Sequence, residues 1–205
     1  MSINLEREPL VKQARRFYAW TILVAWLTWM PTGVLAAADA ATKPPAVGEK
    51  AVNFDLPIVG EDDYIELKNE YANGPVVVVV LRGYPGYQCP LCSQQVGSLI
   101  NRAQALAKET HRVIMVYPGK PTELERHAEQ FIGSRAVRNP LVLVRDPAMQ
   151  MVESWGLRWD APRESAYPAT FVINKNGRVA WSKISKSHAG RSTATEILKE
   201  LKKLK

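Results

Sequence analysis

The residues of this chain best suited to chemistry are two cysteines in the segment Cys89-Pro90-Leu91-Cys92, the only cysteines among its 205 residues. A thiolate is a nucleophile, and it attacks disulfide sulfurs or peroxide oxygens. The two-residue spacer brings both sulfurs within one helical turn, close enough to form a disulfide. The spacing therefore predicts a redox pair that cycles between dithiol and disulfide.

The flanking sequence places this pair at the start of a helix. Residues 76–81 form an unbroken β-branched and aliphatic run, typical of a buried strand. From Pro90 onward, apolar residues recur at spacings of three and four, which predicts a helix with proline at its first position. The unpaired amides of a helix N-terminus favour negative charge and lower a cysteine pKa from about 8.5 to roughly 3.5–7.5.

Two other uses of the cysteines are open. A permanent disulfide is common in secreted domains, but a bridge that closes so short a loop removes little chain entropy. A structural zinc site needs four ligands, and this motif supplies two. His111, His127 and His188 are expected to be solvated surface residues, so neither a metal nor an organic cofactor is predicted.

Residues 1–38 are typical of a secretory signal peptide. Lys12, Arg15 and Arg16 precede the apolar residues 17–30, and small residues follow at 34–40. We expect cleavage there and export to the periplasm or the extracellular space. If it stays uncleaved, the segment is a membrane anchor, because its length falls between a signal core and the ~20 residues that span a bilayer. Residues 39–50, rich in alanine, proline and lysine, are expected to be a linker.

The charge of the chain excludes one class of partner. The formal net charge is +7, and because residues 1–38 hold four basic and two acidic side chains, the remainder carries +5. Basic residues concentrate in the final helix, where they complement its dipole. No basic patch is interleaved with base-stacking residues. We therefore expect no nucleic-acid partner, and membrane contact only through an uncleaved signal segment.

Residues 51–205 are predicted to form one domain. Strand patterns occur at 64–67 (a short edge strand), 76–81, 112–117, 141–144, 170–173 and 178–181, the last two joined as a hairpin at 174–177. Helices are expected from Pro90, from Thr122, over 147–155 and from Thr193. Thr122 with Glu125, and Thr193 with Glu196, have capping-box spacing. Strands that alternate with helices predict an α/β sandwich, with parallel central strands in a mixed sheet and helices on both faces.

With the cysteine motif at the first long strand-to-helix junction, residues 45–204 resemble the thioredoxin fold. Tyr167-Pro168-Ala169-Thr170-Phe171 supports the resemblance, since thioredoxin-like proteins carry a cis-proline before the corresponding strand. The resemblance implies that Pro168 is cis and faces Cys89.

Residues 82–92 are similar to the R-G-x-x-x-x-x-C-P-x-C segment of peroxiredoxin-like proteins, the alkyl hydroperoxide reductase/thiol-specific antioxidant group, and residues 168–173 are also similar to it. In the P-x-x-x-[TS]-x-x-C motif of ordinary peroxiredoxins, Pro85 takes the first position, Cys89 replaces Thr/Ser, and Cys92 becomes the peroxidatic residue. A second register instead aligns Cys89-Pro90 with the family's Cys-Pro. Helix-end exposure favours Cys89 as the first nucleophile.

One departure concerns the arginine that such enzymes place just before the strand, where Pro168 stands here. Arg82 or Arg163 is a candidate to replace it, although each is also expected to be a surface ion-pair residue. Thr170, Pro85 and Pro168 complete the expected supporting residues around Cys89 and Cys92.

The resemblance implies an exported thiol oxidoreductase that reduces peroxides, with an external thiol or a thioredoxin-type protein as electron donor. The alternatives are thiol-disulfide exchange on exported proteins, as in cytochrome maturation, and a non-enzymatic protein that binds copper(I) through both thiolates.

Overall fold

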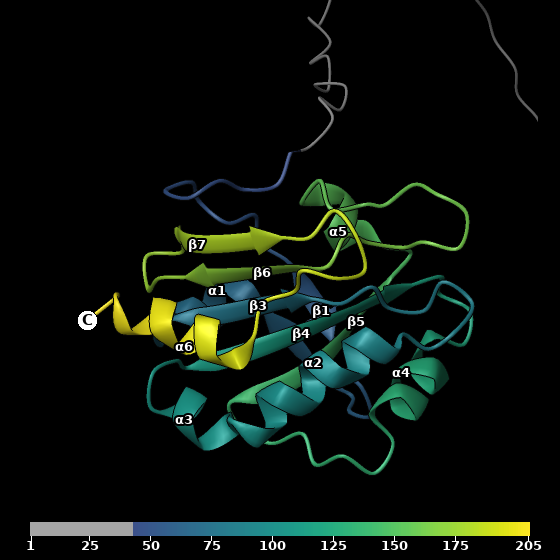
Figure 1. Cartoon of the computed structure of the whole chain (residues 1–205), viewed down its shortest axis with the longest axis horizontal. Helices are drawn as coiled ribbons and strands as arrows, with labels where there is room; N and C mark the ends of the chain where they lie inside the picture. The colour runs from purple at the N-terminus through teal and green to yellow at the C-terminus, as the bar shows by residue number, and fades with distance from the viewer. Residues whose placement is uncertain (1–42) are drawn as a thin grey trace, which may run out of the picture. The chain divides into compact units, whose positions relative to one another are not determined.

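The computed structural model describes residues 43–205, and a five-stranded mixed sheet is at its centre (Figure 1). The strand order is β5 (Leu141–Pro147), β4 (Arg112–Gly119), β3 (Val76–Val80), β6 (Ala169–Ile173) and β7 (Val179–Ile184). β3, β4 and β5 are parallel, whereas β6 and β7 run antiparallel to their neighbours. The expected α/β sandwich with a mixed sheet is confirmed.

β3 occupies the middle of the sheet because both of its faces are apolar. All five of its residues are valines with no exposed surface. Such a continuous β-branched run suits a strand that is covered on both sides.

The helices divide between the two faces of the sheet (Figure 1). α2 (Pro90–Asn101), α3 (Ala103–Ala107), α4 (Leu124–Ile132) and α6 (Ala194–Lys202) pack on the face that carries Val77 and Val79. α1 (Leu67–Ala72) and α5 (Gln150–Ser154) pack on the opposite face. Alternation of side chains along β3 therefore supplies two separate cores, and the cysteines belong to the core under α2.

A second, two-stranded sheet covers part of the α1 face. β1 (Asp55–Pro57) and β2 (Tyr64–Glu66) pair antiparallel. The strand expected at 64–67 thus exists, but it belongs to this hairpin rather than to an edge of the main sheet.

Of the two capping boxes predicted at helix starts, the structure contains one. At α6, Thr193 and Glu196 form the predicted capping box. At α4, the predicted box of Thr122 and Glu125 is wrong: the N-cap is Glu123 in a left-handed conformation (φ 59°). The Glu125 carboxylate is used elsewhere, since it accepts from the Gly60 amide at 2.6 Å and pairs with Arg145.

The remaining sequence predictions concern the ends of the domain. The 174–177 hairpin is present, and the Asn174 side chain accepts from the amides of Asn176 and Arg178. Within the expected linker, Gly48 donates to Val179 O at 2.8 Å and Val179 donates back to Glu49 O at 2.9 Å.

The predicted signal peptide lies outside the described residues. Between residues 43 and 205, no helix is long and apolar enough to cross a membrane.

Candidate active site

The chain reaches the cysteines through a tight turn after β3. Gly83 has φ 71°, and a Cβ built on it would lie 1.8 Å from the carbonyl oxygen of Pro118. The next amide, of Tyr84, donates to that same carbonyl at 3.0 Å. Only glycine combines this backbone conformation with so close an approach to β4.

Cys89 is the N-cap of α2, and Pro90 occupies the first helical turn, as the sequence predicts. The Cys92 amide donates to the Cys89 sulfur, with N and Sγ 3.3 Å apart. Both cysteines are free thiols in this structure. Their exposed fractions are 4% for Cys89 and 0% for Cys92, so Cys89 is the more accessible of two buried residues.

Arg191, in the segment between β7 and α6, contacts the Cys89 sulfur. Its Nη2 atom donates to Cys89 Sγ at 3.6 Å. Its other nitrogens donate to Gln95 Oε1 at 3.2 Å and to His188 O at 3.0 Å. The guanidinium is thus held in place by α2 on one side and by its own loop on the other.

These contacts separate the acidities of the two thiols. The pKa of Cys89 falls to about 5, chiefly because the Cys92 thiol donates a hydrogen bond to it. Burial opposes the shift, while the Cys92 amide and the charges of Arg191 and Arg82 favour it. The pKa of Cys92 is raised, because its thiol proton is held by Cys89 and the side chain is buried. The pair is therefore arranged as a Cys89 thiolate beside a Cys92 thiol.

Arg82 forms an ion pair as expected, but it is not a surface residue. It is 1% exposed, pairs with Glu164, and donates from Nη2 to Arg163 O at 2.6 Å. The His188 ring nitrogen lies 2.9 Å from the other Glu164 oxygen. Burial works against the charge of Glu164, but the hydrogen bonds from Arg82 and His188 lower its pKa. His188, expected to be merely solvated, is part of this charge network.

The prediction that Pro168 is cis is wrong. The cis bond within residues 43–205 precedes Pro140, and Tyr167–Pro168 is trans. Pro168 O accepts from the Ser185 amide at 2.8 Å, so the hydrogen bonding between β6 and β7 continues one residue beyond the two strands. The expected packing of this proline on Cys89 stays a prediction.

Thr170 connects to the site through other side chains. Its hydroxyl lies 2.6 Å from that of Ser192, whose carbonyl accepts from the Gln95 amide at 3.3 Å. Gln95 in turn accepts from Arg191. The other candidate arginine, Arg163, is exposed, and its guanidinium lies 5.3 Å from the centre of the Tyr87 ring.

Sequence reasoning missed Arg191, Gln95 and Glu164. Arg191 and Cys89 are 102 positions apart, and nothing local to either residue marks the contact. The one available signal was the capping box at Thr193, which fixes where the preceding loop must join α6.

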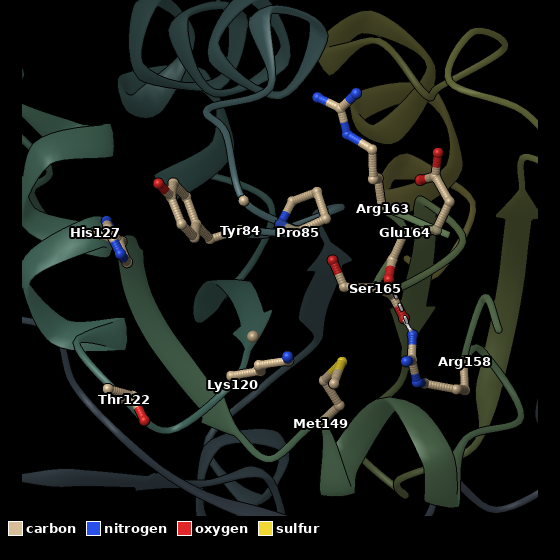
Figure 2. A pocket seen from close by; sticks show the side chains of 12 residues that line it. Tyr84, Pro85, Lys120, Thr122, His127, Met149, Arg158, Arg163, Glu164 and Ser165 are labelled. Carbon is tan, nitrogen blue, oxygen red and sulfur yellow. Dashed lines mark hydrogen bonds between the residues drawn. The ribbon is translucent and has the colours of Figure 1, made fainter. Parts of the chain in front are cut away.

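Two cavities flank the cysteine segment. The first, which we call the helix groove, has a volume of about 350 Å³ and is lined by residues 188–193 and by side chains of α2, including Leu91 and Gln95. The second, the loop cavity, has about 340 Å³ and is lined by the loop 84–86, by residues after β4 and by residues near Arg163 (Figure 2). In the described part of the chain, no cluster of three or more His, Cys, Asp or Glu side chains could hold a metal ion.

Among the solved structures similar to this chain are three peroxiredoxins, each with a TM-score of 0.60 over 78% of the chain. They are the peroxidoxin BcpB from Mycobacterium tuberculosis (18% identity, 99% of its chain covered), the mitochondrial 2-Cys peroxiredoxin from Plasmodium falciparum (16%, 94%) and a reduced 2-Cys peroxiredoxin from Plasmodium vivax (18%, 81%). At these identities the likeness establishes the fold. A search of curated proteins finds no significant match.

The family model for AhpC/TSA proteins matches residues 47–182, a segment that contains β3, the cysteine motif and β6. This match covers more than half of the chain. The chain therefore belongs to the AhpC/TSA family of thiol-dependent oxidoreductases.

Proposed function

We propose that this protein is an exported thiol peroxidase in which Cys89 attacks the peroxide and Cys92 resolves the product. The observation that carries the proposal is the environment of the Cys89 sulfur, which receives hydrogen bonds from the Cys92 amide and from Arg191. Both donors stabilise a thiolate at neutral pH.

The reaction balances with the two cysteines alone. The Cys89 thiolate attacks the terminal oxygen of ROOH, the O–O bond breaks, and Cys89 becomes a sulfenic acid while RO⁻ takes up a proton and leaves as ROH. The Cys92 thiol then attacks the sulfenic sulfur, which forms the Cys89–Cys92 disulfide and releases water. Two electrons from an external dithiol, small or thioredoxin-like, restore both thiols.

Arg191 supports this chemistry in the place of the arginine that the family carries before β6. It donates to Cys89 from the loop before α6 rather than from the strand. A fixed guanidinium next to the sulfur stabilises the thiolate, and it can donate to the peroxide oxygen that accumulates charge as the O–O bond breaks.

Disulfide exchange on exported proteins is the second candidate. It is favoured by the helix groove, which has room for a peptide side chain and is lined by Arg191, the residue that donates to the Cys89 sulfur. A peroxidase turns over hydrogen peroxide much faster than a protein disulfide, and an exchange enzyme does the reverse. Parallel assays of the two substrates with one dithiol donor separate the candidates.

The order of the cysteines is tested by mass spectrometry after one equivalent of hydrogen peroxide. Wild-type protein should form the internal disulfide, whereas Cys92→Ser should accumulate sulfenic acid on Cys89. Cys89→Ser should remain a free thiol at Cys92, because that sulfur is buried and its pKa is raised. Sulfenic acid that forms only in Cys89→Ser would reverse the assignment.

A further inference from the structure

We propose that the loop cavity is a binding site for a small aromatic carboxylate. At about 340 Å³, the cavity is in the size range of ligand pockets. It shares no lining residue with the helix groove, so the two cavities are distinct. The proposal does not depend on whether peroxides or disulfides are reduced at Cys89.

The charges around the cavity favour an anion. The basic lining residues are Lys120, Arg158 and Arg163, of which Arg158 pairs with Glu153 at 4.0 Å and Arg163 lies over the Tyr87 ring. The acidic lining residue Glu164 already pairs with Arg82 and His188. Among residues 43–205, no carboxylate lies within ion-pair distance of the Lys120 ammonium. In Figure 2 the Lys120 side chain extends across the cavity toward Met149. The ammonium group is therefore available to a ligand carboxylate.

Arg158 gives the basic side of the cavity a fixed geometry. Its Nη1 atom donates to three backbone carbonyls, those of Trp159 at 2.9 Å, Glu164 at 3.3 Å and Ser165 at 2.6 Å. These bonds hold the guanidinium against the chain segment that forms one wall. A ligand consequently meets a preformed positive wall, with little ordering cost.

The opposite wall suits a flat apolar group. Tyr84 stacks on His127, with ring centroids 3.6 Å apart and an interplanar angle of 11°. Figure 2 shows Tyr84 between His127 and Pro85, and Met149 entering from below. Aromatic and thioether side chains pack well against an aromatic ring. In addition, His127 Nδ1 is buried and has no hydrogen-bond partner among the described residues, so one polar atom of this wall is unsatisfied.

Backbone conformation singles out the same place. Four non-glycine residues of the described chain have positive φ: Glu123, Ala148, Met149 and Arg163. Met149 and Arg163 line the loop cavity, Ala148 precedes the first of them, and Glu123 follows the lining residue Thr122. Such conformations cost free energy and cluster at ligand sites, where they hold side chains in defined positions.

The test measures calorimetric binding of benzoate and of its neutral isostere benzamide to the reduced full-length chain. We expect benzoate to bind at least fivefold more tightly than benzamide, and Lys120→Gln to abolish that difference while benzamide binding stays the same. Lys175→Gln is the matched control, since Lys175 is an exposed lysine of the hairpin turn that does not line the cavity.

Three results would overturn the proposal: no saturable benzoate binding, equal affinities for benzoate and benzamide, or benzoate binding that Lys120→Gln leaves unchanged. Inorganic phosphate must compete poorly with benzoate. If it displaces benzoate at equal concentration, the cavity binds simple anions and the aromatic part of the assignment is wrong. All of these measurements are binding constants, so their outcome does not depend on whether the protein has peroxidase activity.

Discussion

Cys89 and Cys92 have the same side chain and sit three positions apart, yet the structure gives them opposite acidities. Cys89 receives donors from Cys92 and Arg191, whereas the Cys92 thiol is itself a donor and has no exposed surface. A hydrogen bond to a thiolate favours the charged form, and burial without such bonds favours the neutral form. Cys89 is therefore the thiolate and Cys92 the thiol of the pair because the Cys89 sulfur lies at the end of the helix.

The low pKa of Cys89 predicts its reactivity as a function of pH. Iodoacetamide alkylation of reduced protein at Cys89 should be half-maximal at about pH 5, because the thiolate predominates above its pKa. Below that pH the rate should fall as the sulfur becomes protonated. Peptide mapping by mass spectrometry at a series of pH values measures the profile. In Cys92→Ala, which lacks the thiol donor, the midpoint should move upward; a wild-type midpoint between pH 8 and 9 would contradict the assignment.

Removal of the Arg191 charge should weaken the thiolate. In Arg191→Gln the pKa of Cys89 should rise by about one unit, the low end of the effect of an adjacent opposite charge. Peroxide consumption should fall with it. Arg138→Gln is the control, because Arg138 is exposed and outside the site. If both variants have the same alkylation profile as the wild type, Arg191 does not act on the sulfur.

At the scale of elements, three segment ends build the site. The turn after β3 delivers Cys89 to the start of α2, the β7–α6 connection delivers Arg191, and residues 163–165 bind Arg82. Each segment end is defined by a local backbone constraint, such as the close approach at Gly83 or the cap at Thr193. Function should therefore be sensitive to changes that leave the cysteines untouched.

Gly83→Ala should destabilise the protein by more than about 2 kcal/mol, because the new Cβ meets the Pro118 carbonyl and the backbone is left-handed. Gly97→Ala is the matched control, since its Cβ would meet nothing within 4 Å. Because Gly97 lies inside α2, Gly97→Ala should raise the unfolding free energy by up to about 1 kcal/mol. Urea unfolding of the two reduced variants measures both changes in stability. Equal urea midpoints for Gly83→Ala and Gly97→Ala would refute the steric argument.

Thr193→Ala should cost about 1 kcal/mol of unfolding free energy, because the Glu196 amide at the start of α6 loses its acceptor. Thr193→Ser should keep most of the stability, since it retains the hydroxyl. Denaturant unfolding of the two variants tests this. A serine variant as unstable as the alanine variant would show that the methyl group, not the cap, matters.

At the scale of the whole molecule, the domain of residues 43–205 is one redox unit, with the helix groove and the loop cavity on either side of the cysteine segment. The proposed exported location puts this unit in an oxidising compartment, where the Cys89–Cys92 disulfide is stable unless a dedicated donor reduces it. Supply of reductant would then control turnover.

The proposed export predicts the N-terminus of the mature chain. We expect it to begin between Ala37 and Ala41, after removal of the signal segment. N-terminal sequencing of protein from the native host tests this. A Met1 or Ser2 terminus in the membrane fraction would instead identify an anchored protein.

Much of this architecture could be predicted from the sequence alone, because the signals are local. The valine run of β3, the helical periodicity after Pro90 and the capping residues of α6 each act within a few positions. Periodicity and capping depend on neighbours in the chain, so they can be seen without a fold. The position of Cys89 at a helix N-terminus, and the acidity expected there, followed from these signals.

Tertiary structure decided what depends on distant segments. Tyr167–Pro168 is trans although its motif predicted cis, and the Pro168 carbonyl accepts from Ser185 in the segment after β7. Arg82 looked like a surface residue but is buried against Glu164, 82 positions away. Arg191 reaches Cys89 only because α6 packs on the same face of the sheet as α2. Sequence determined where the thiols lie, and packing determined which charges surround them, because electrostatic partners are selected by proximity in space rather than along the chain.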